Sequence, residues 1–195
     1  MNWLAHVFLS EPETEPRLGQ VIADWVKGAD RAQFSPGIQR GISCHIEIDR
    51  FTDTHPVVIR SMERIQSPFK RYAAVLVDVF YDYVLSCEWG AYCSIPLPAF
   101  VSTVYAGFSE YLPILPPRVR TGFEHMITAD WLGSYGTASG VDTLLRRISG
   151  RLTRTNNLGD GVSELLAHDH DFRQDFAEFF PALQKHTHVW MQSRP

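Results

Sequence analysis

Two groups of acidic and imidazole side chains recur at helical spacing in the first half of the chain. Asp78 and Asp82 lie four residues apart in a largely apolar segment, so on a helix both carboxylates project from one face, about one turn apart. His45, Asp49 and Asp53 repeat this spacing over two turns. Imidazole nitrogen combined with carboxylate oxygen suits manganese or iron, and no thiolate is present to favour a softer metal. The pattern predicts a divalent metal site.

The carboxylate pair has no local counter-charge. No lysine or arginine lies between Arg71 and Arg118, so neither Asp78 nor Asp82 has a basic neighbour three or four positions away. Two carboxylates withdrawn from water cost several kcal/mol unless a cation or a distant arginine compensates them. We therefore expect a cation beside the pair. The alternatives are a long-range salt bridge and a solvated stripe on the helix surface.

The histidine column has simpler alternatives. Asp49 could serve only to orient His45, and Arg50 stands three residues before Asp53 as an ion-pair partner. Each residue alone is a weak signal. Two acidic columns on neighbouring helices are a stronger one, because bundle cores often hold metals through facing side chains. His6 and Asp24 lie beside apolar segments and could complete such a set, and the alternative is that both are hydrogen-bonded scaffold residues.

The elements that carry these residues are predicted to be helices. Ser35 and Pro36 supply an N-cap residue and a first-turn proline for a helix that runs through His45 and Asp49. His55-Pro56 ends or kinks that helix, and a short helix follows from Val58 to Ile65. The column of polar residues is therefore expected on one continuous helix.

A central helix is predicted next. Ser67-Pro68 opens a long helix from about Phe69 to Trp89, which is apolar on all sides and so belongs in the core. Prolines divide the middle of the chain into short helices, and the aromatic tail is expected to pack as a terminal helix. We predict an all-α fold, a single-domain helical bundle over residues 1–195.

Composition narrows the function classes. The chain has 195 residues, 45% of them hydrophobic, and a formal net charge of −4, which favours neither a nucleic-acid binder nor an acidic disordered tail. Its three cysteines have no Cys-x-x-Cys spacing, so a disulfide framework and a zinc ribbon are not indicated. With no signal-peptide pattern and no apolar stretch long enough to span a bilayer, a cytoplasmic protein is expected.

Taken together, these segments resemble the acyl carrier protein phosphodiesterases, also called acyl carrier protein hydrolases, along nearly the whole chain. Short motifs, in this order and spacing, carry the resemblance: Asn2-x-Leu4-Ala5-His6, Ala23-Asp24-Trp25-Val26-Lys27-Gly28, Gly41-Ile42-x-x-His45-x-x-Ile48-Asp49-x-Phe51-Thr52-Asp53, and Asp78-x-x-x-Asp82-x-x-Leu85 followed by Trp89. The ending, with Asp175-Phe176 and Phe179-Phe180-Pro181, is also similar.

The resemblance implies an all-helical fold related to the HD-type metal phosphohydrolases. It also implies removal of 4'-phosphopantetheine from holo acyl carrier protein, which leaves the apo protein. The reaction would use a divalent metal, typically manganese, with magnesium or iron as alternatives. The family's polar motif positions are occupied by His6, Asp24, His45, Asp49, Asp53, Asp78 and Asp82.

This sequence departs from the family pattern at four positions. Phe8 stands where histidine is common, Gln20 where asparagine is usual, and Ile46 where arginine is common. Tyr83 replaces an expected histidine. If that histidine is a ligand or a proton donor in relatives, the activity here would be altered or lost.

The requirements of phosphodiester hydrolysis then suggest roles. The reaction needs an activated water, neutralisation of the charge on the phosphoryl oxygens, and a proton for the departing serine oxygen. The metal is expected on some subset of Asp24, His45, Asp49, Asp78 and Asp82. His6 is the candidate general acid, and Lys27 could contact the phosphate, although a solvated lysine at a helix end is the alternative.

Carrier proteins of this kind are acidic, so a basic docking surface is expected. A cluster with no acid between Asp142 and Asp160 is the candidate partner-binding surface, against the alternative of a solvated helix face: Arg146, Arg147, Arg151 and Arg154. Two rival functions stay open. One is an HD-type phosphohydrolase that acts on a nucleotide, and the other is a helical binding module that has lost the metal.

Overall fold

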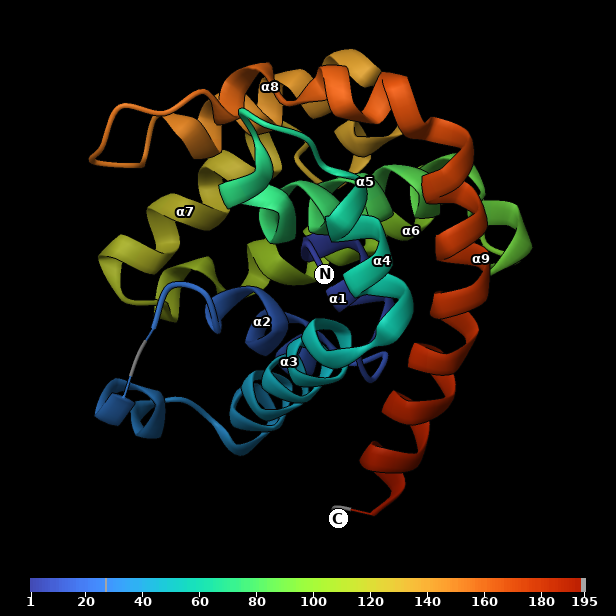
Figure 1. Ribbon diagram of the computed structural model, residues 1–195. Coiled ribbons are helices and arrows are strands. Elements are labelled where there is room, and N and C mark those ends of the chain that lie inside the picture. The colour runs from blue at the N-terminus through green and yellow to red at the C-terminus, as the bar shows by residue number, and fades with distance from the viewer. Residues whose placement is uncertain (27, 194–195) are drawn as a thin grey trace.

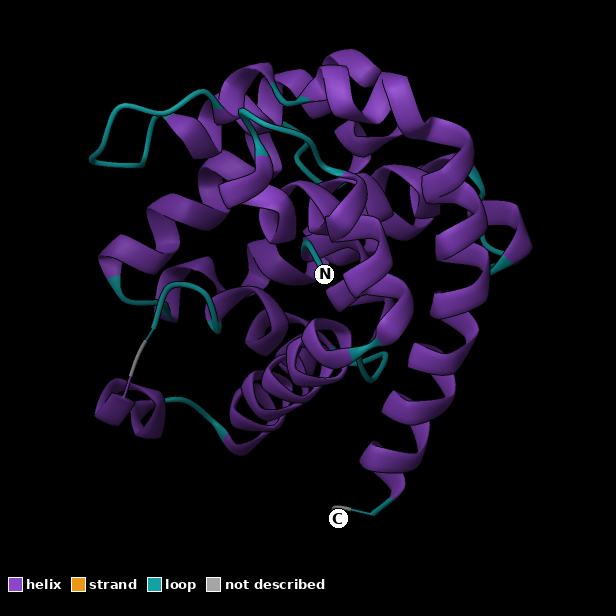
Figure 2. Cartoon of the chain, viewed as in Figure 1, coloured by secondary structure: helices purple, strands orange, loops and turns teal. Residues whose placement is uncertain are grey.

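The computed structural model describes residues 1–26 and 28–193, and every regular element in them is a helix (Figure 1, Figure 2). The all-α prediction is confirmed, whereas the relation to HD-type folds stays a prediction. The buried apolar side chains form one cluster that draws on helices from α1 to α9. The α-helices are α1 (Trp3–Leu9), α2 (Thr14–Ile22), α3 (Pro36–Thr54), α4 (Pro56–Arg64), α5 (Ala73–Cys87), α6 (Leu97–Tyr111), α7 (Pro117–Thr128), α8 (Ala138–Ser149) and α9 (Val162–Gln192).

Helix α3 begins and ends where the sequence predicted. The Ser35 hydroxyl accepts a hydrogen bond from the Ile38 N–H at 3.4 Å, and Pro36 occupies the first turn, where its missing N–H costs nothing. His55 ends α3, and its Nδ1 accepts from the Val57 N–H at 3.3 Å, which caps α4. His45 and Asp49 consequently lie on one unbroken helix.

Helices α2 and α3 pack backbone against backbone. A Cβ added at Gly19 would overlap the Ile38 carbonyl oxygen, and one added at Gly41 would overlap the Pro16 carbonyl oxygen. Only glycine permits this approach at both positions. Because the axes are so close, the side chain of His45 on α3 reaches the main chain of α2.

Helix α5 starts later than predicted, at Ala73 rather than near Phe69. Residues 70–72 form a short 3-10 turn in which the Tyr72 N–H donates to the Phe69 carbonyl at 2.8 Å. Phe69 is buried, so the chain folds inward before the helix begins. The predicted central position is confirmed, since most of α5 is buried, including the polar side chains of Tyr81 and Asp82.

The tail forms the long outer helix α9, which runs along one side of the molecule (Figure 1). Its aromatic residues Phe172, Phe176, Phe179 and Phe180 are fully buried, as the terminal-helix prediction required. The backbone leaves helical geometry once inside this span, at His168. Among the described residues, no helix is both long enough and apolar enough to cross a membrane.

A buried carboxylate joins α9 to α4. Asp175 is 1% exposed and accepts from Ser61 Oγ at 2.7 Å, Arg60 Nε at 2.8 Å and Arg64 Nε at 3.1 Å. Burial alone would raise the pKa of Asp175, but the hydrogen bonds from Arg64, Ser61 and Arg60 lower it. The carboxylate is thus ionised and fully partnered.

We expect Asp175→Ala to lower the free energy of unfolding by about 2 kcal/mol, less than for a fully buried pair because both arginines reach solvent. Urea unfolding measures the change. Glu178→Ala is the matched control, since Glu178 binds the same Arg60 but is 59% exposed. Equal midpoints for the two variants would contradict this assignment.

Candidate metal centre

His45 is held in one orientation by the main chain of α2. Its Nδ1 lies 2.8 Å from the Gln20 carbonyl oxygen, which can only accept, so Nδ1 carries the proton and donates. Its Nε2 faces Asp49 Oδ2 at 3.0 Å and Asp24 Oδ1 at 3.5 Å. In metal-binding histidines, one ring nitrogen commonly donates to a backbone carbonyl and so turns the other nitrogen toward the metal.

His6, on α1, stacks on His45 with ring centroids 4.0 Å apart. Its Nδ1 lies 3.1 Å from Gln20 Oε1, and its Nε2 lies 3.1 Å from both Asp49 Oδ1 and the Met1 carbonyl oxygen. Burial and the charge of His45 lower the pKa of His6, which favours the neutral ring. A neutral imidazole has one N–H, so it cannot donate to acceptors on both sides, whereas a cation at Nε2 would satisfy the second side.

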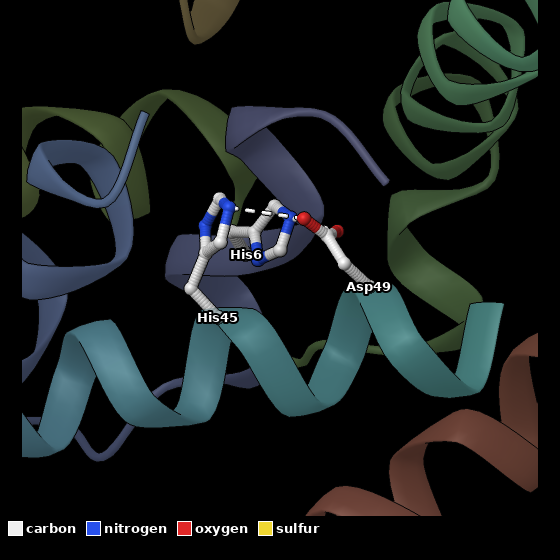
Figure 3. A group of neighbouring side chains, drawn as sticks. All are labelled: His6, His45 and Asp49. Carbon is white, nitrogen blue, oxygen red and sulfur yellow. Dashed lines mark hydrogen bonds and ion pairs between the residues drawn. The ribbon is translucent and has the colours of Figure 1, made fainter. Parts of the chain in front are cut away.

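Asp49 joins the two rings (Figure 3). His6, His45 and Asp49 each offer a ligand atom, and these atoms lie within 4.8 Å of one another. Burial alone would raise the pKa of Asp49, but His45 and His6 hold it well below its usual range. Burial alone would lower the pKa of His45, yet Asp24 and Asp49 raise it to about 9. The group favours a positive charge at its centre, and its nitrogen and oxygen donors fit a divalent metal.

Asp24 lies at the rim of this group. Its Oδ2 accepts from the Trp3 indole N–H at 2.7 Å, and its side chain remains 45% exposed. Burial alone would raise the pKa of Asp24, but His45 and Trp3 help to lower it. Asp24 is therefore an ionised carboxylate with access to solvent beside His45.

The predicted cation beside the carboxylate pair is the Met1 ammonium. Its nitrogen is 2.9 Å from Asp78 Oδ1 and 3.5 Å from Asp49 Oδ1. Burial alone would lower the pKa of this amine, but Asp78 and Asp49 raise it to about 11. Both carboxylates approach one nitrogen, so Asp78 on α5 faces Asp49 on α3 there, as predicted for Asp78 but not for Asp82.

Asp82 has different partners. Its Oδ2 accepts from the Leu4 N–H at 2.7 Å and its Oδ1 from the Ala5 N–H at 3.3 Å, while the Asn2 side chain accepts from the Trp3 N–H at 2.8 Å. These bonds satisfy the free N–H groups at the start of α1, the helix that carries His6. The geometry favours a positioning role for Asp82, and its predicted role as a metal ligand stays untested.

Asp53 contributes no ligand atom to the His6, His45 and Asp49 group. Asp53 is exposed, and the anticipated Arg50 partner binds Glu47 instead, with Nε 3.1 Å from Oε2. Burial, followed by the charge of Asp78, raises the pKa of Asp53. Lys27 lies outside the described residues, so its predicted phosphate contact remains a prediction.

Comparison with known proteins identifies the family. A family model described as acyl carrier protein phosphodiesterase matches residues 1–183. The chain belongs to this family. It is 27% identical over 186 residues to the acyl carrier protein phosphodiesterase of Photorhabdus laumondii, covering 95% of this chain and 94% of that one. It is 30% identical over 184 residues to the Salmonella agona protein of the same name, with 94% and 95% covered. No solved structure matches the chain significantly.

The four departures from the family pattern lie in different environments. Phe8 is partly buried and packs against Trp89 and Phe180 at the edge of the core, and Ile46 is exposed on α3. Gln20 contacts both histidines, through its side chain and its carbonyl. Tyr83, which gave most reason to doubt activity, faces α9, where its hydroxyl accepts from Arg173 Nη2 at 3.2 Å. Among described residues, Tyr83 is therefore not part of the metal-ligating group.

The structure divides the predicted arginine cluster. Arg146 pairs with Asp142 at 2.9 Å and with Asp160 at 3.5 Å, and Arg154 lines a separate cavity. Arg147 and Arg151 instead lie over the Trp131 ring, 4.3 and 5.4 Å from its centroid. The four side chains do not form one surface, and whether any binds a partner stays a prediction.

Several residues that build the centre were not identified as site residues from the sequence. Gln20 appeared only as a departure from the family pattern, although it orients both histidines. Trp3, which binds Asp24, had no distinguishing signal. Asn2 could have been found, because asparagine directly before an apolar run is a common N-cap.

Proposed function

We propose that this protein is a metal-dependent phosphodiester hydrolase that removes 4'-phosphopantetheine from holo acyl carrier protein and leaves the apo protein. Its relatives' name supplies the substrate. The observation that carries the metal dependence is His45, whose Nδ1 is bound to the Gln20 carbonyl while its Nε2 faces Asp24 and Asp49.

His6, His45 and Asp49 would hold the metal, with Asp24 beside them. His6 was predicted as the general acid, but its complete burial and its Nε2 contact with Asp49 favour a ligand role. Bound there, a divalent metal lowers the pKa of a coordinated water and offsets charge on the phosphoryl oxygens. Manganese is the proposed ion, with magnesium or iron as alternatives.

The chain's own side chains would orient the reactants. Ionised Asp24, reachable from solvent, can accept a hydrogen bond from the attacking water and so direct its oxygen at phosphorus. Attack forms a P–O bond to water and breaks the P–O bond to the carrier serine, and the proton lost by the attacking water balances the one that the serine oxygen gains. Asp78, beside Asp49, keeps the ammonium of Met1 in place at the wall of the centre.

The direct test is turnover of holo acyl carrier protein, with release of 4'-phosphopantetheine followed by mass spectrometry. Enzyme stripped with a chelator should be inactive and should regain activity when Mn²⁺ is added back. Mg²⁺ and Fe²⁺ are tested in separate samples. Cleavage of nucleotides but not of the carrier would instead support a nucleotide phosphohydrolase. A protein that binds no metal and cleaves neither would be a binding module.

We expect Asp24→Ala and Asp78→Ala to abolish turnover in proteins that remain folded. The thermal midpoint should stay near that of the parent in Asp24→Ala, whose side chain is 45% exposed, and should fall in Asp78→Ala, because the buried Met1 ammonium loses its nearest carboxylate. Circular dichroism melts and the carrier assay measure the two effects. Near-normal activity in both variants would refute this assignment.

A further inference from the structure

A groove beside Asp24 is lined by arginines that form no ion pair in the described chain. One cavity of about 300 Å³ is lined by Asp24, Trp25, Arg118, Gly122 and Arg151. A second, of about 310 Å³, is lined by His125, Thr128, Ala129, Trp131, Arg147 and Arg151. Arg151 belongs to both, so the two hollows adjoin, and Asp24 lines the first of them.

The three arginines have no carboxylate partner within ion-pair distance among residues 1–26 and 28–193. Arg147 and Arg151 are held over the same Trp131 ring, where their like charges repel. Burial, followed by the charge of Arg151, lowers the pKa of Arg147. Two guanidinium groups held together without an acid favour an anion between or beside them.

An unpaired donor lies beside the groove. Trp131 is 4% exposed, and its indole nitrogen is buried without a hydrogen-bond partner in the described chain. A buried N–H without a partner costs about 1–3 kcal/mol of stability, so buried N–H groups usually have a hydrogen-bond partner. Trp131 lines the second cavity together with both arginines.

Packed aromatic rings lie along the groove. Trp131 stacks on Trp3 at 5.2 Å, and Trp25 meets Phe123 edge to face at 5.1 Å. A Cβ at Gly122 would come within 2.8 Å of the Trp25 ring, so glycine is needed for this packing. Trp3 also binds Asp24, which ties these rings to the metal centre.

We propose that Arg118, Arg147 and Arg151 form an oxyanion site that binds the phosphate end of the substrate next to Asp24. This inference rests on the proposed function, since it names the part of the substrate that occupies the groove. The guanidinium fork matches phosphate oxygens in a two-point contact that a lysine does not make. Because the groove lies beside Asp24, its arginines are placed to bind the substrate phosphate. The surface carboxylates of a docked carrier would lie outside the metal centre.

The test compares binding of 4'-phosphopantetheine and of pantetheine, which lacks the phosphate, by titration calorimetry of the metal-loaded protein. Arg151→Gln should weaken 4'-phosphopantetheine binding about tenfold and leave pantetheine unchanged, and Arg118→Gln should act in the same direction. Inorganic phosphate should compete with the phosphorylated ligand in the parent and less so in Arg151→Gln.

Arg71→Gln is the matched control, because Arg71 also lies over an aromatic ring, that of Tyr72 at 4.6 Å, but borders a different cavity. It removes the same charge and should leave both affinities within twofold. Equal binding by Arg151→Gln and the parent overturns the proposal, as does a parent that does not bind 4'-phosphopantetheine. If Arg151→Gln raises only the KM for intact carrier and leaves 4'-phosphopantetheine binding unchanged, the proposal is also overturned. The arginines would then be assigned to carrier docking. Arginine-dependent phosphate binding without carrier cleavage would refute the proposed function and leave the oxyanion site standing.

Discussion

Replacing Asp49 with alanine is expected to abolish turnover and metal binding while the protein remains folded. Asp49 is the residue that both His6 Nε2 and His45 Nε2 contact, each at about 3 Å, so its loss removes a ligand and the group that orients two others. A metal contributes several kcal/mol to the stabilisation of a phosphoryl transition state, so kcat/KM should fall about a thousandfold or more. The side chain is 40% exposed, so the substitution leaves no core cavity.

Asp53→Ala is the matched control for this prediction. Asp53 lies one turn further along α3, is exposed, and has no recorded ion pair in the described chain. Metal content by mass spectrometry and turnover of holo carrier should both fall in Asp49→Ala and stay near the parent in Asp53→Ala. The metal-site assignment would not survive equal losses in the two variants.

Replacing Asp82 with alanine is expected to destabilise the protein rather than only inactivate it. The Leu4 and Ala5 N–H groups would lose their acceptors at the buried start of α1, which should cost about 2–4 kcal/mol. Because α1 carries His6, activity should fall with the stability. Urea unfolding of chelator-treated protein, at about pH 5, measures the effect.

Asp82→Asn separates the hydrogen bonds from the charge. Burial raises the pKa of Asp82 to about 7, above the value of about 4 for an unfolded aspartate. Between these values the folded state binds the extra proton, so the parent loses stability as pH rises from about 4 to about 7. Asp82→Asn does not titrate, so its stability relative to the parent should increase over this window and then level off. If the difference in free energy of unfolding between the two proteins were constant across that range, it would contradict a raised pKa for the buried Asp82 carboxyl.

The sequence determined the helices and the order of polar residues along them. Helix caps and periodicity are local properties, which is why Ser35 and His55 bound α3 where expected, and why His45 and Asp49 share one face. The family followed from short motifs in a fixed order, and the comparison with known proteins agrees. The largest boundary error was the start of α5, because the buried position of Phe69 depends on the rest of the core.

The tertiary structure decided which of these side chains share a centre. Asp78 and Asp82 are equivalent by spacing, yet one meets the Met1 ammonium and the other meets backbone N–H groups of α1, more than seventy residues away in sequence. Gln20 contacts both histidines because α2 and α3 pack closely at two glycines. Arg151 lies over the Trp131 ring, whereas Arg146 pairs with Asp160, although the sequence does not distinguish the two arginines. Spacing fixes the direction of a side chain on its own helix, whereas the charge and burial it meets come from other helices, and these set its pKa, its partners and its chemistry.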